Sequence, residues 1–155
     1  MKRILLVLGV LWAATSLSAQ NLVTGEKAPD LKVAEWLVGK SRLRSGYPTF
    51  VEFFFSRSEP SLRRLAVLDG FVRDHKGRLN VILLAREPKQ TIADLLEGKG
   101  YAFAVALDDE ARTFTAYGVQ FVPFGVLFDD RGKVVWFGNS SKFGDDSLKE
   151  SLGWK

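Results

Sequence analysis

The chain of 155 residues contains no cysteine, a single histidine (His75), one methionine and five prolines. Without a thiol it has no cysteine nucleophile, no disulfide and no thiolate ligands for zinc or an iron–sulfur cluster. A single histidine also excludes a metal site built from several imidazoles. Lys and Arg exceed Asp and Glu only by 22 to 18, and they are scattered, so the charge predicts no nucleic-acid partner. We expect no metal and no bound cofactor.

Long apolar runs are scarce as well, and the most prominent one lies at the N-terminus. Lys2 and Arg3 precede the apolar residues Ile4 to Ala14, and small residues follow as far as Ala19. About eleven apolar residues form a helix of about 16 Å, which is too short for a hydrocarbon core of about 30 Å. The pattern therefore predicts a signal peptide over residues 1–19 and an exported protein, periplasmic or secreted, with no membrane attachment after cleavage. A retained N-terminal membrane anchor is the alternative.

Residues 20–155 contain no repeat and no Pro/Gly/Ser-rich linker, which indicates one domain. Runs of β-branched and aromatic residues predict strands, and apolar residues three or four apart predict helices. The predicted order is a strand at Thr49–Phe55, a helix from Ser58 to His75, a strand at Leu79–Ala85, a helix at Lys89–Glu97, a strand at Ala102–Leu107, a helix from Asp108 to Tyr117, strands at Phe124–Phe128 and Lys133–Phe137, and a helix at Asp145–Leu152. The first strands form a βαβ unit and are parallel, whereas the last two strands form an antiparallel hairpin.

Four segments follow this order and share motifs with one family. They are Gly25–Leu31 (Gly-x-x-Ala-Pro-x-apolar), Val51–Phe55, Tyr117–Pro123 (Tyr-Gly-Val-x-x-Val-Pro) and Asp129–Val135. Together they resemble the thioredoxin fold, most closely the exported TlpA-like thiol–disulfide oxidoreductases and their peroxiredoxin relatives, over Gly25 to Leu152. Residues 86–107 resemble the helix-plus-strand insertion of these relatives. The resemblance implies a three-layer α/β/α sandwich with a mixed sheet, and a cis bond before Pro123, which would face the active site.

The chain departs from this family at the redox motif, Trp-Cys-x-x-Cys, which opens the first helix. The matching positions are Arg57, Ser58, Glu59, Pro60 and Ser61. In the family the helix N-terminus lowers the pKa of a thiol. A serine hydroxyl is a far weaker acid and has no disulfide state, so the resemblance predicts the fold without the thiol–disulfide activity.

Other chemistry at this turn lacks a base. His75 lies about 21 Å along the helix axis from Ser61, and we interpret it as a helix C-terminal residue favoured by the dipole. Ser58 is interpreted as the N-cap of the helix. Three nearby arginines either attract an anion or an acidic peptide end, or form a solvated basic surface: Arg57, Arg63 and Arg64.

The remaining acidic and aromatic clusters favour structural interpretations. Asp108–Glu110, Asp129–Asp130 and Asp145–Asp146 lack the spacing of a calcium loop and are interpreted as helix-start and turn residues. The aromatic side chains Phe53 to Phe55, Phe71 and Phe124 are assigned to the core.

These observations favour a non-catalytic, exported thioredoxin-fold protein that binds another protein or an extended peptide. In the family, the groove beside the cis-proline exposes backbone groups to an extended chain, and that contact needs no cysteine. The matching groove residues are Phe121, Val122 and Pro123. Two alternatives remain: a non-redox enzyme or anion-binding site at the Ser58–Ser61 helix N-terminus, and an accessory subunit that stabilises a redox partner.

Overall fold

The structure is a computed structural model that describes residues 22–108 and 110–155. The predicted signal peptide lies outside the described residues. The elements are β1 (Glu35–Val38), η1 (a 3-10 turn at Lys40–Arg42), β2 (Thr49–Phe54), α1 (Glu59–Asp74), β3 (Asn80–Ala85), α2 (Lys89–Leu96), β4 (Ala104–Leu107), α3 (Arg112–Ala116), β5 (Phe124–Phe128), β6 (Val134–Asn139) and α4 (Asp145–Leu152). Every predicted strand and helix is present in the predicted order. β1 and η1 were not predicted.

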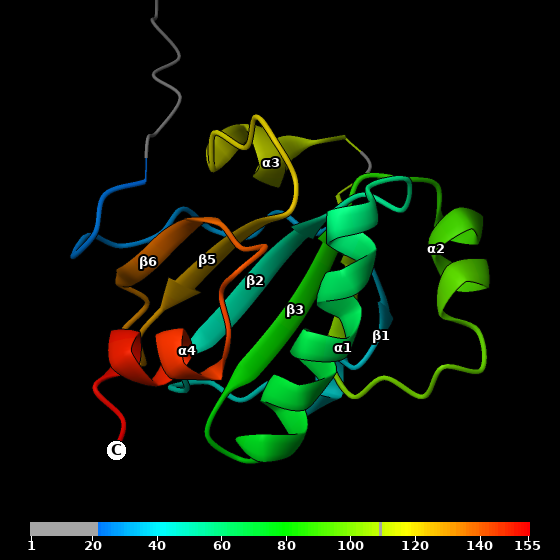
Figure 1. The fold of residues 1–155 in the computed structure, drawn as a ribbon. Coiled ribbons are helices and arrows are strands. Elements are labelled where there is room, and N and C mark those ends of the chain that lie inside the picture. Colours follow the sequence, from blue (N-terminus) through cyan, green and yellow to red (C-terminus); the bar gives the residue numbers. More distant parts are fainter. Residues whose placement is uncertain (1–21, 109) are drawn as a thin grey trace, which may run out of the picture.

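The strands form one six-stranded mixed sheet in the order β1-β4-β3-β2-β5-β6 (Figure 1). β2, β3 and β4 are parallel, as the βαβ pattern predicts. β5 pairs antiparallel with β2, and β6 pairs antiparallel with β5. β1 adds an antiparallel edge next to β4. The apolar stretch that contains β1 is too short to indicate a strand by itself, so only its pairing with β4 identifies it as one.

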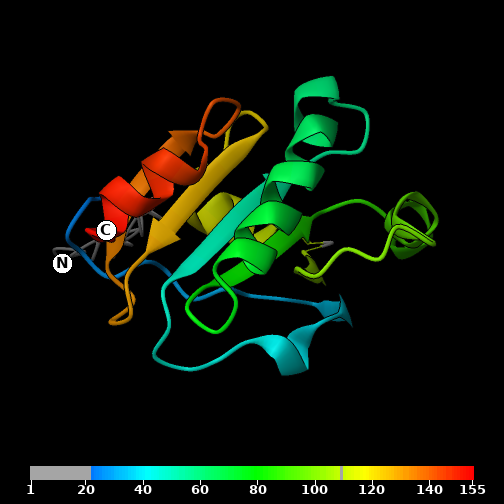
Figure 2. The same cartoon turned by 60° about the horizontal axis from the view of Figure 1, so that its bottom comes forward.

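Helices and chain segments cover both faces of this sheet. One apolar cluster joins the sheet to α1, α2 and α4 through Leu68, Ile92 and Leu148. The other joins the opposite face to α3 and to the segment before β1 through Phe114 and Leu31. Figure 2 shows α1 and α4 above one face, with the blue N-terminal segment passing beneath the other. The predicted three-layer sandwich is therefore confirmed.

The helix expected from Asp108 begins later, at Arg112. The Asp108 carboxylate accepts hydrogen bonds from the backbone N–H groups of Thr113 and Phe114, at 2.8 and 2.9 Å. Ala111, between them, has a left-handed backbone with φ of 52°. The acidic side chain thus caps the helix from a preceding turn instead of lying in its first turn; Asp109 lies outside the described residues.

Gly125 in β5 permits a close approach between the sheet and the residues that follow β6. A Cβ atom at this position would lie 2.7 Å from Cζ of Phe50 and 3.1 Å from Cβ of Ser140. Phe50 in turn stacks on Phe143, with ring centroids 5.2 Å apart. Any side chain at Gly125 would therefore push apart the layer that brings Ser140 and Phe143 over β2.

We predict that Gly125→Ala lowers the free energy of unfolding by about 1–3 kcal/mol, because it overpacks a filled core. Gly70→Ala, inside α1, is the matched control. There the nearest heavy atom to a new Cβ would be the Asp74 carboxylate at 4.0 Å. Alanine is the better helix former, so this change should stabilise the protein by up to about 1 kcal/mol. Urea denaturation measures both, and equal effects of the two changes would contradict the packing described here.

Candidate functional site

The turn that matches the redox motif is built as a capped helix start. Ser58 is the N-cap of α1, and its hydroxyl accepts a hydrogen bond from the backbone N–H of Ser61 at 3.3 Å. Glu59 and Pro60 occupy the first turn, where a carboxylate and a ring without an N–H are both favourable. The Glu59 carboxylate also pairs with Arg63 one turn later, at 3.2 Å. The predicted capping role of Ser58 is confirmed.

Ser61 and Arg64 face inward from this helix, and both are buried. The Ser61 side chain is fully enclosed, and its hydroxyl has no hydrogen-bond partner among the described residues. The Arg64 guanidinium donates through Nε to Glu52 at 3.2 Å and through Nη1 to the Phe143 carbonyl at 2.6 Å. The idea that Arg64 belongs to an exposed basic cluster was therefore wrong.

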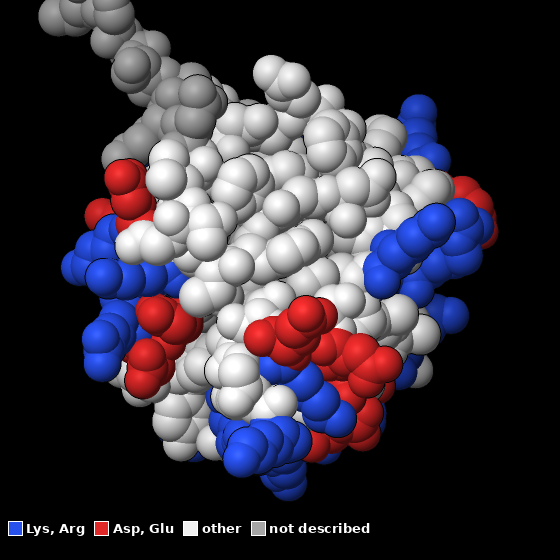
Figure 3. Space-filling view, turned by 60° about the vertical axis from the view of Figure 1, so that its left-hand side comes forward, with Lys and Arg blue, Asp and Glu red and all other residues white. Residues whose placement is uncertain are grey.

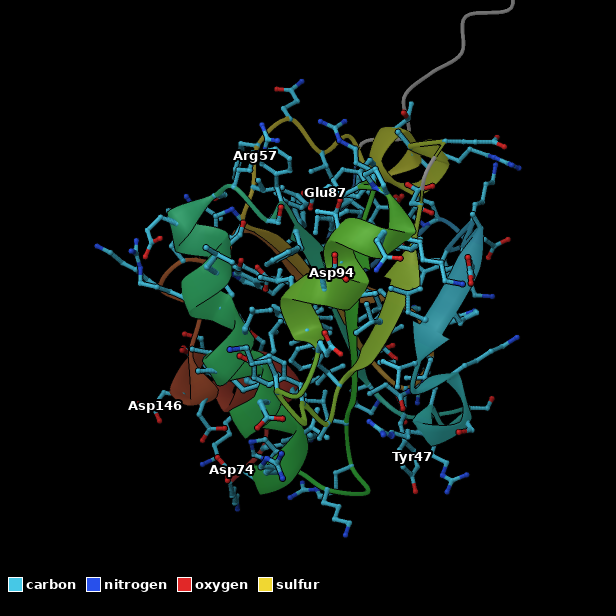
Figure 4. All side chains as sticks on the ribbon, turned by 90° about the vertical axis from the view of Figure 1, so that its right-hand side faces the viewer. Tyr47, Arg57, Asp74, Glu87, Asp94 and Asp146 are labelled. Atoms are coloured by element: carbon cyan, nitrogen blue, oxygen red, sulfur yellow. The ribbon has the colours of Figure 1, made fainter. Side chains whose placement is uncertain are left out.

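The other two arginines of that expected cluster remain at the surface, but they do not act together with Arg64. Arg63 is engaged by Glu59, and Arg57 is exposed at the tip of the turn. Figure 4 labels Arg57 at the end of α1 that carries the motif, with Glu87 nearby. The anion site expected from three arginines thus reduces to two exposed guanidinium groups beside a capped helix, and one of them, Arg63, is paired with Glu59.

A buried carboxylate, Glu52, lies beneath this turn. Glu52 is fully enclosed in β2 and is held by Arg64 from α1 and by the hydroxyl of Ser140, which donates to Oε1. Burial raises the pKa of the Glu52 carboxyl to about 7, against the opposing effects of Arg64 and Ser140. This acid–base group is enclosed on all sides, so it stabilises the arrangement of β2 and α1 and does not face a ligand.

A shallow groove lies beside the turn. Its hollow of about 160 Å³ is lined from the end of β2, from Arg86 and α3, and from the loop that precedes β5. The Val122–Pro123 bond in that loop is cis, which confirms the prediction. Phe55 and Phe121 line the hollow and are 40% and 50% exposed. Placing Phe55 in the core was wrong, because β2 ends at Phe54 and the chain turns outward at its end.

The backbone of the groove loop is open to a ligand. Within residues 22–108 and 110–155, the N–H and C=O groups of Gln120, Phe121 and Val122 form no hydrogen bonds. The loop is anchored on one side, since the Val119 N–H donates to Phe114 at 3.0 Å. Free backbone groups between exposed aromatic side chains are what an added strand requires.

The remaining motif residues serve the fold. The Tyr117 hydroxyl donates to the Pro29 carbonyl at 2.6 Å, so two of the four family-like segments meet directly. Burial and nearby Asp30 raise the pKa of the Tyr117 phenol. His75 ends α1, at the opposite end of that helix from Ser58, and bonds to Asp145. A serine–histidine pair is thus excluded by position.

Sequence reasoning missed the polar residues that hold the site from within. Glu52 interrupts an otherwise apolar strand, and Arg64 lies on the same helical face as Leu68 and Phe71. Both positions therefore indicated a buried charge in the sequence. Glu87 is also buried and accepts hydrogen bonds from the backbone N–H and the hydroxyl of Ser56. Nothing in the local sequence marks that contact, because the two residues are far apart in the chain.

The structure adds two negative findings for the described part of the chain. No group of three or more His, Asp or Glu side chains is placed there to hold a metal ion. No helix between residues 22 and 155, residue 109 aside, is long and apolar enough to cross a membrane. The acidic clusters act in turns and caps instead; Asp129, for example, accepts from the N–H groups of Arg131 and Lys133.

Comparison with known proteins agrees with this architecture. No protein-family model matches the chain. The thiol-disulfide oxidoreductase ResA of Halalkalibacterium halodurans is 26% identical over 116 residues, which is 72% of this chain and 65% of the relative's length. A candidate thiol:disulfide interchange protein DsbE from Chlorobium tepidum superposes with a TM-score of 0.69 at 23% identity, over 85% of this chain and 99% of the other. A thiol-disulfide isomerase from Corynebacterium glutamicum superposes with a TM-score of 0.66 at 19% identity, over 81% of this chain and 93% of the other.

The chain therefore has the thioredoxin-like fold, and its sequence is similar to that of a thiol–disulfide oxidoreductase. It differs from a thiol-dependent oxidoreductase at the decisive position, because it contains no sulfur nucleophile. Serine occupies the two motif positions, where one hydroxyl caps the helix and the other is buried.

The raised pKa of Glu52 predicts a specific dependence of stability on pH. The ordinary pKa of a glutamate carboxyl is 4.5, and the pKa of Glu52 in the folded state is about 7. Between these values the folded protein holds a proton that the unfolded chain releases, so the free energy of unfolding falls as pH rises and is level above about 7. We predict a fall of a few kcal/mol, since one pKa unit corresponds to about 1.4 kcal/mol.

Glu52→Gln should remove this fall, because glutamine does not titrate. Urea denaturation of both proteins between about pH 4 and 8 measures the difference, in which the titration of all other groups cancels. Parallel curves for the two proteins would show that Glu52 titrates normally and would contradict its enclosed environment.

Proposed function

We propose that the chain is an exported, redox-inactive thioredoxin-fold protein that binds an extended peptide segment of another protein in the groove beside Pro123. The observation that carries this proposal is the row of free backbone groups at residues 120–122, flanked by the exposed rings of Phe55 and Phe121. An extended chain would pair with that backbone as an added strand and place apolar side chains against the two rings. No step of this contact uses a thiol.

The surroundings of the groove support an apolar segment. The ring centroids of Phe121 and Phe124 are 5.5 Å apart, and those of Phe124 and Phe137, on β6, are 6.5 Å apart. A row of aromatic rings therefore runs from the groove toward the sheet edge. Figure 3, which brings the β6 side forward, shows a broad uncharged surface with charged residues gathered at its margins. The exposed rings of Phe121 and Phe137 give an incoming apolar segment a contact area.

Two exposed arginines favour acidic residues next to the apolar segment. The Arg86 guanidinium lines the hollow and lies 5.2 Å from the Phe114 ring, and Arg57 is exposed on the neighbouring turn. Charges at the rim of an interface act mainly on association rate and partner choice. The resemblance of the Tyr117–Pro123 segment to the oxidoreductase family supports the location of the groove, whereas the redox-inactive binding role is inferred for this chain from its own residues.

An NMR titration with unfolded, carboxymethylated α-lactalbumin tests the proposal, because this probe offers extended segments and no free thiol. We predict saturable shifts of the amide signals of Gln120, Phe121 and Val122. Phe121→Asp should weaken binding at least about tenfold, since it places a charge in an apolar contact.

Val38→Asp is the matched control, because Val38 is 44% exposed on β1, at the opposite sheet edge. It introduces the same charge and should leave the affinity unchanged, and thermal melting verifies that both variants fold. Shifts that are absent from the groove loop, or equal losses in the two variants, would refute the proposed peptide site.

A further inference from the structure

A second hollow lies at the end of the molecule away from the groove. Its volume is about 560 Å³, within the range of small-molecule sites. Three separate segments form its walls: the stretch around η1 that leads to β2, the C-terminal end of α1, and the loop before β4. In Figure 4 these segments meet between the labelled Asp74, at the end of α1, and Tyr47. The proposed peptide site shares no residue with it.

The charged side chains that line this hollow are all cationic. They are Arg42, Arg44, Arg73 and Lys76, and no Asp or Glu is among the lining residues. Asp69 pairs with Arg73 at 2.6 Å. Asp74, at the helix end, is not among the residues that line the hollow. An excess of positive charge remains in a concave surface, where low-dielectric walls strengthen its field.

Two of the four cationic side chains have hydrogen-bond donors that no described residue accepts. Among the described residues, the side chains of Arg44 and Lys76 form no ion pair or hydrogen bond. Arg42 uses one nitrogen on the Ala102 carbonyl at 3.1 Å, which fixes its stem against the third wall. The hollow thus combines one oriented guanidinium with two cations that are free to engage a ligand.

The placement of these cations defines the shape of the ligand. Arg42 and Arg44 approach from the segment before β2, whereas Arg73 and Lys76 approach from α1. A phosphate group presents oxygen atoms in several directions, so it can accept hydrogen bonds from cations of both segments at once. Tyr47 and Tyr101 also line the hollow and offer ring surface to the remainder of an organic ligand.

We propose that this hollow binds a small phosphate compound with two or more negative charges. The hollow has a volume suited to a small molecule, so we commit to a free phosphate compound and not to the headgroup of a membrane lipid. More than one negative charge on the ligand is needed to match the cationic excess, which has to outweigh the repulsion from the negative C-terminal end of α1 on the same wall.

Isothermal titration calorimetry with inorganic pyrophosphate tests this site on the protein without its predicted signal peptide and, in parallel, on the full chain. We expect one saturable site whose affinity falls as salt is raised from about 20 to 200 mM, because charge attraction is screened. Arg44→Gln and Lys76→Gln should each weaken binding at least about fivefold, since each removes a charge-assisted hydrogen bond. Neither side chain supports the fold, so both variants should melt like the parent protein.

Arg131→Gln and Lys133→Gln are matched controls. Both residues are exposed at the turn before β6, and each substitution removes one positive charge away from the hollow. They should change the affinity less than about twofold. The proposal is overturned if pyrophosphate shows no saturation by about 5 mM, if the controls weaken binding as much as the site variants, or if citrate binds as tightly. Binding to phosphatidylglycerol vesicles without binding to pyrophosphate would overturn it as well.

Discussion

The buried contact between Glu52 and Arg64 is the constraint around which the structure is arranged. It joins the central strand β2 to α1, while Ser140 and the Phe143 carbonyl join the same pair to the segment after β6. A buried ion pair offsets its desolvation cost better when further hydrogen bonds satisfy its other polar atoms. Here three elements contribute partners, although Nη2 of Arg64 has none among the described residues. The centroids of the Phe50 and Phe71 rings each lie 5.9 Å from Cζ of the guanidinium. The position of α1 on the sheet depends on this contact and on Leu65, Leu68 and Phe71 of the same helix, which belong to the apolar core.

The residues that hold the helix start in place are different from those that form the groove surface. The helix start is held by a serine cap above and a buried charge pair below, neither of which needs a ligand or a reactive group. The groove beside it keeps its open backbone and its exposed rings. A fold shared with thiol-dependent enzymes is therefore compatible with a role in binding, because binding depends on the groove and exchange depends on sulfur.

Much of the fold could be predicted because its signals are local. The apolar strand of β2, the three- and four-residue spacing of α1 and the Tyr-Gly-Val motif each specify an element without reference to distant residues. The same local reasoning failed for Arg64, whose partner Glu52 lies in another element. It also failed for Phe55, whose exposure depends on where β2 ends. A contact between a helix and a strand decided the first and the end of β2 decided the second, while strand pairing made β1 an edge strand.

The basic hollow was missed for the same reason. Its four cations come from two segments separated by most of β2 and α1, and the sequence shows them only as scattered charges. Folding brings them together around one hollow, where Asp69 pairs with one of the four, Arg73. A modest net charge of +4 therefore conceals a strongly cationic site at one end of the molecule.

A double-mutant cycle on Glu52→Gln and Arg64→Gln at about pH 8 tests most directly whether the buried pair positions α1. At that pH the carboxyl, with its pKa of about 7, is ionised. The two changes should be coupled by about 2 kcal/mol or more, beyond the few tenths expected for the exposed pair of Glu59 and Arg63. A coupling energy within about 0.5 kcal/mol of zero would show that the two residues act independently and would contradict this arrangement.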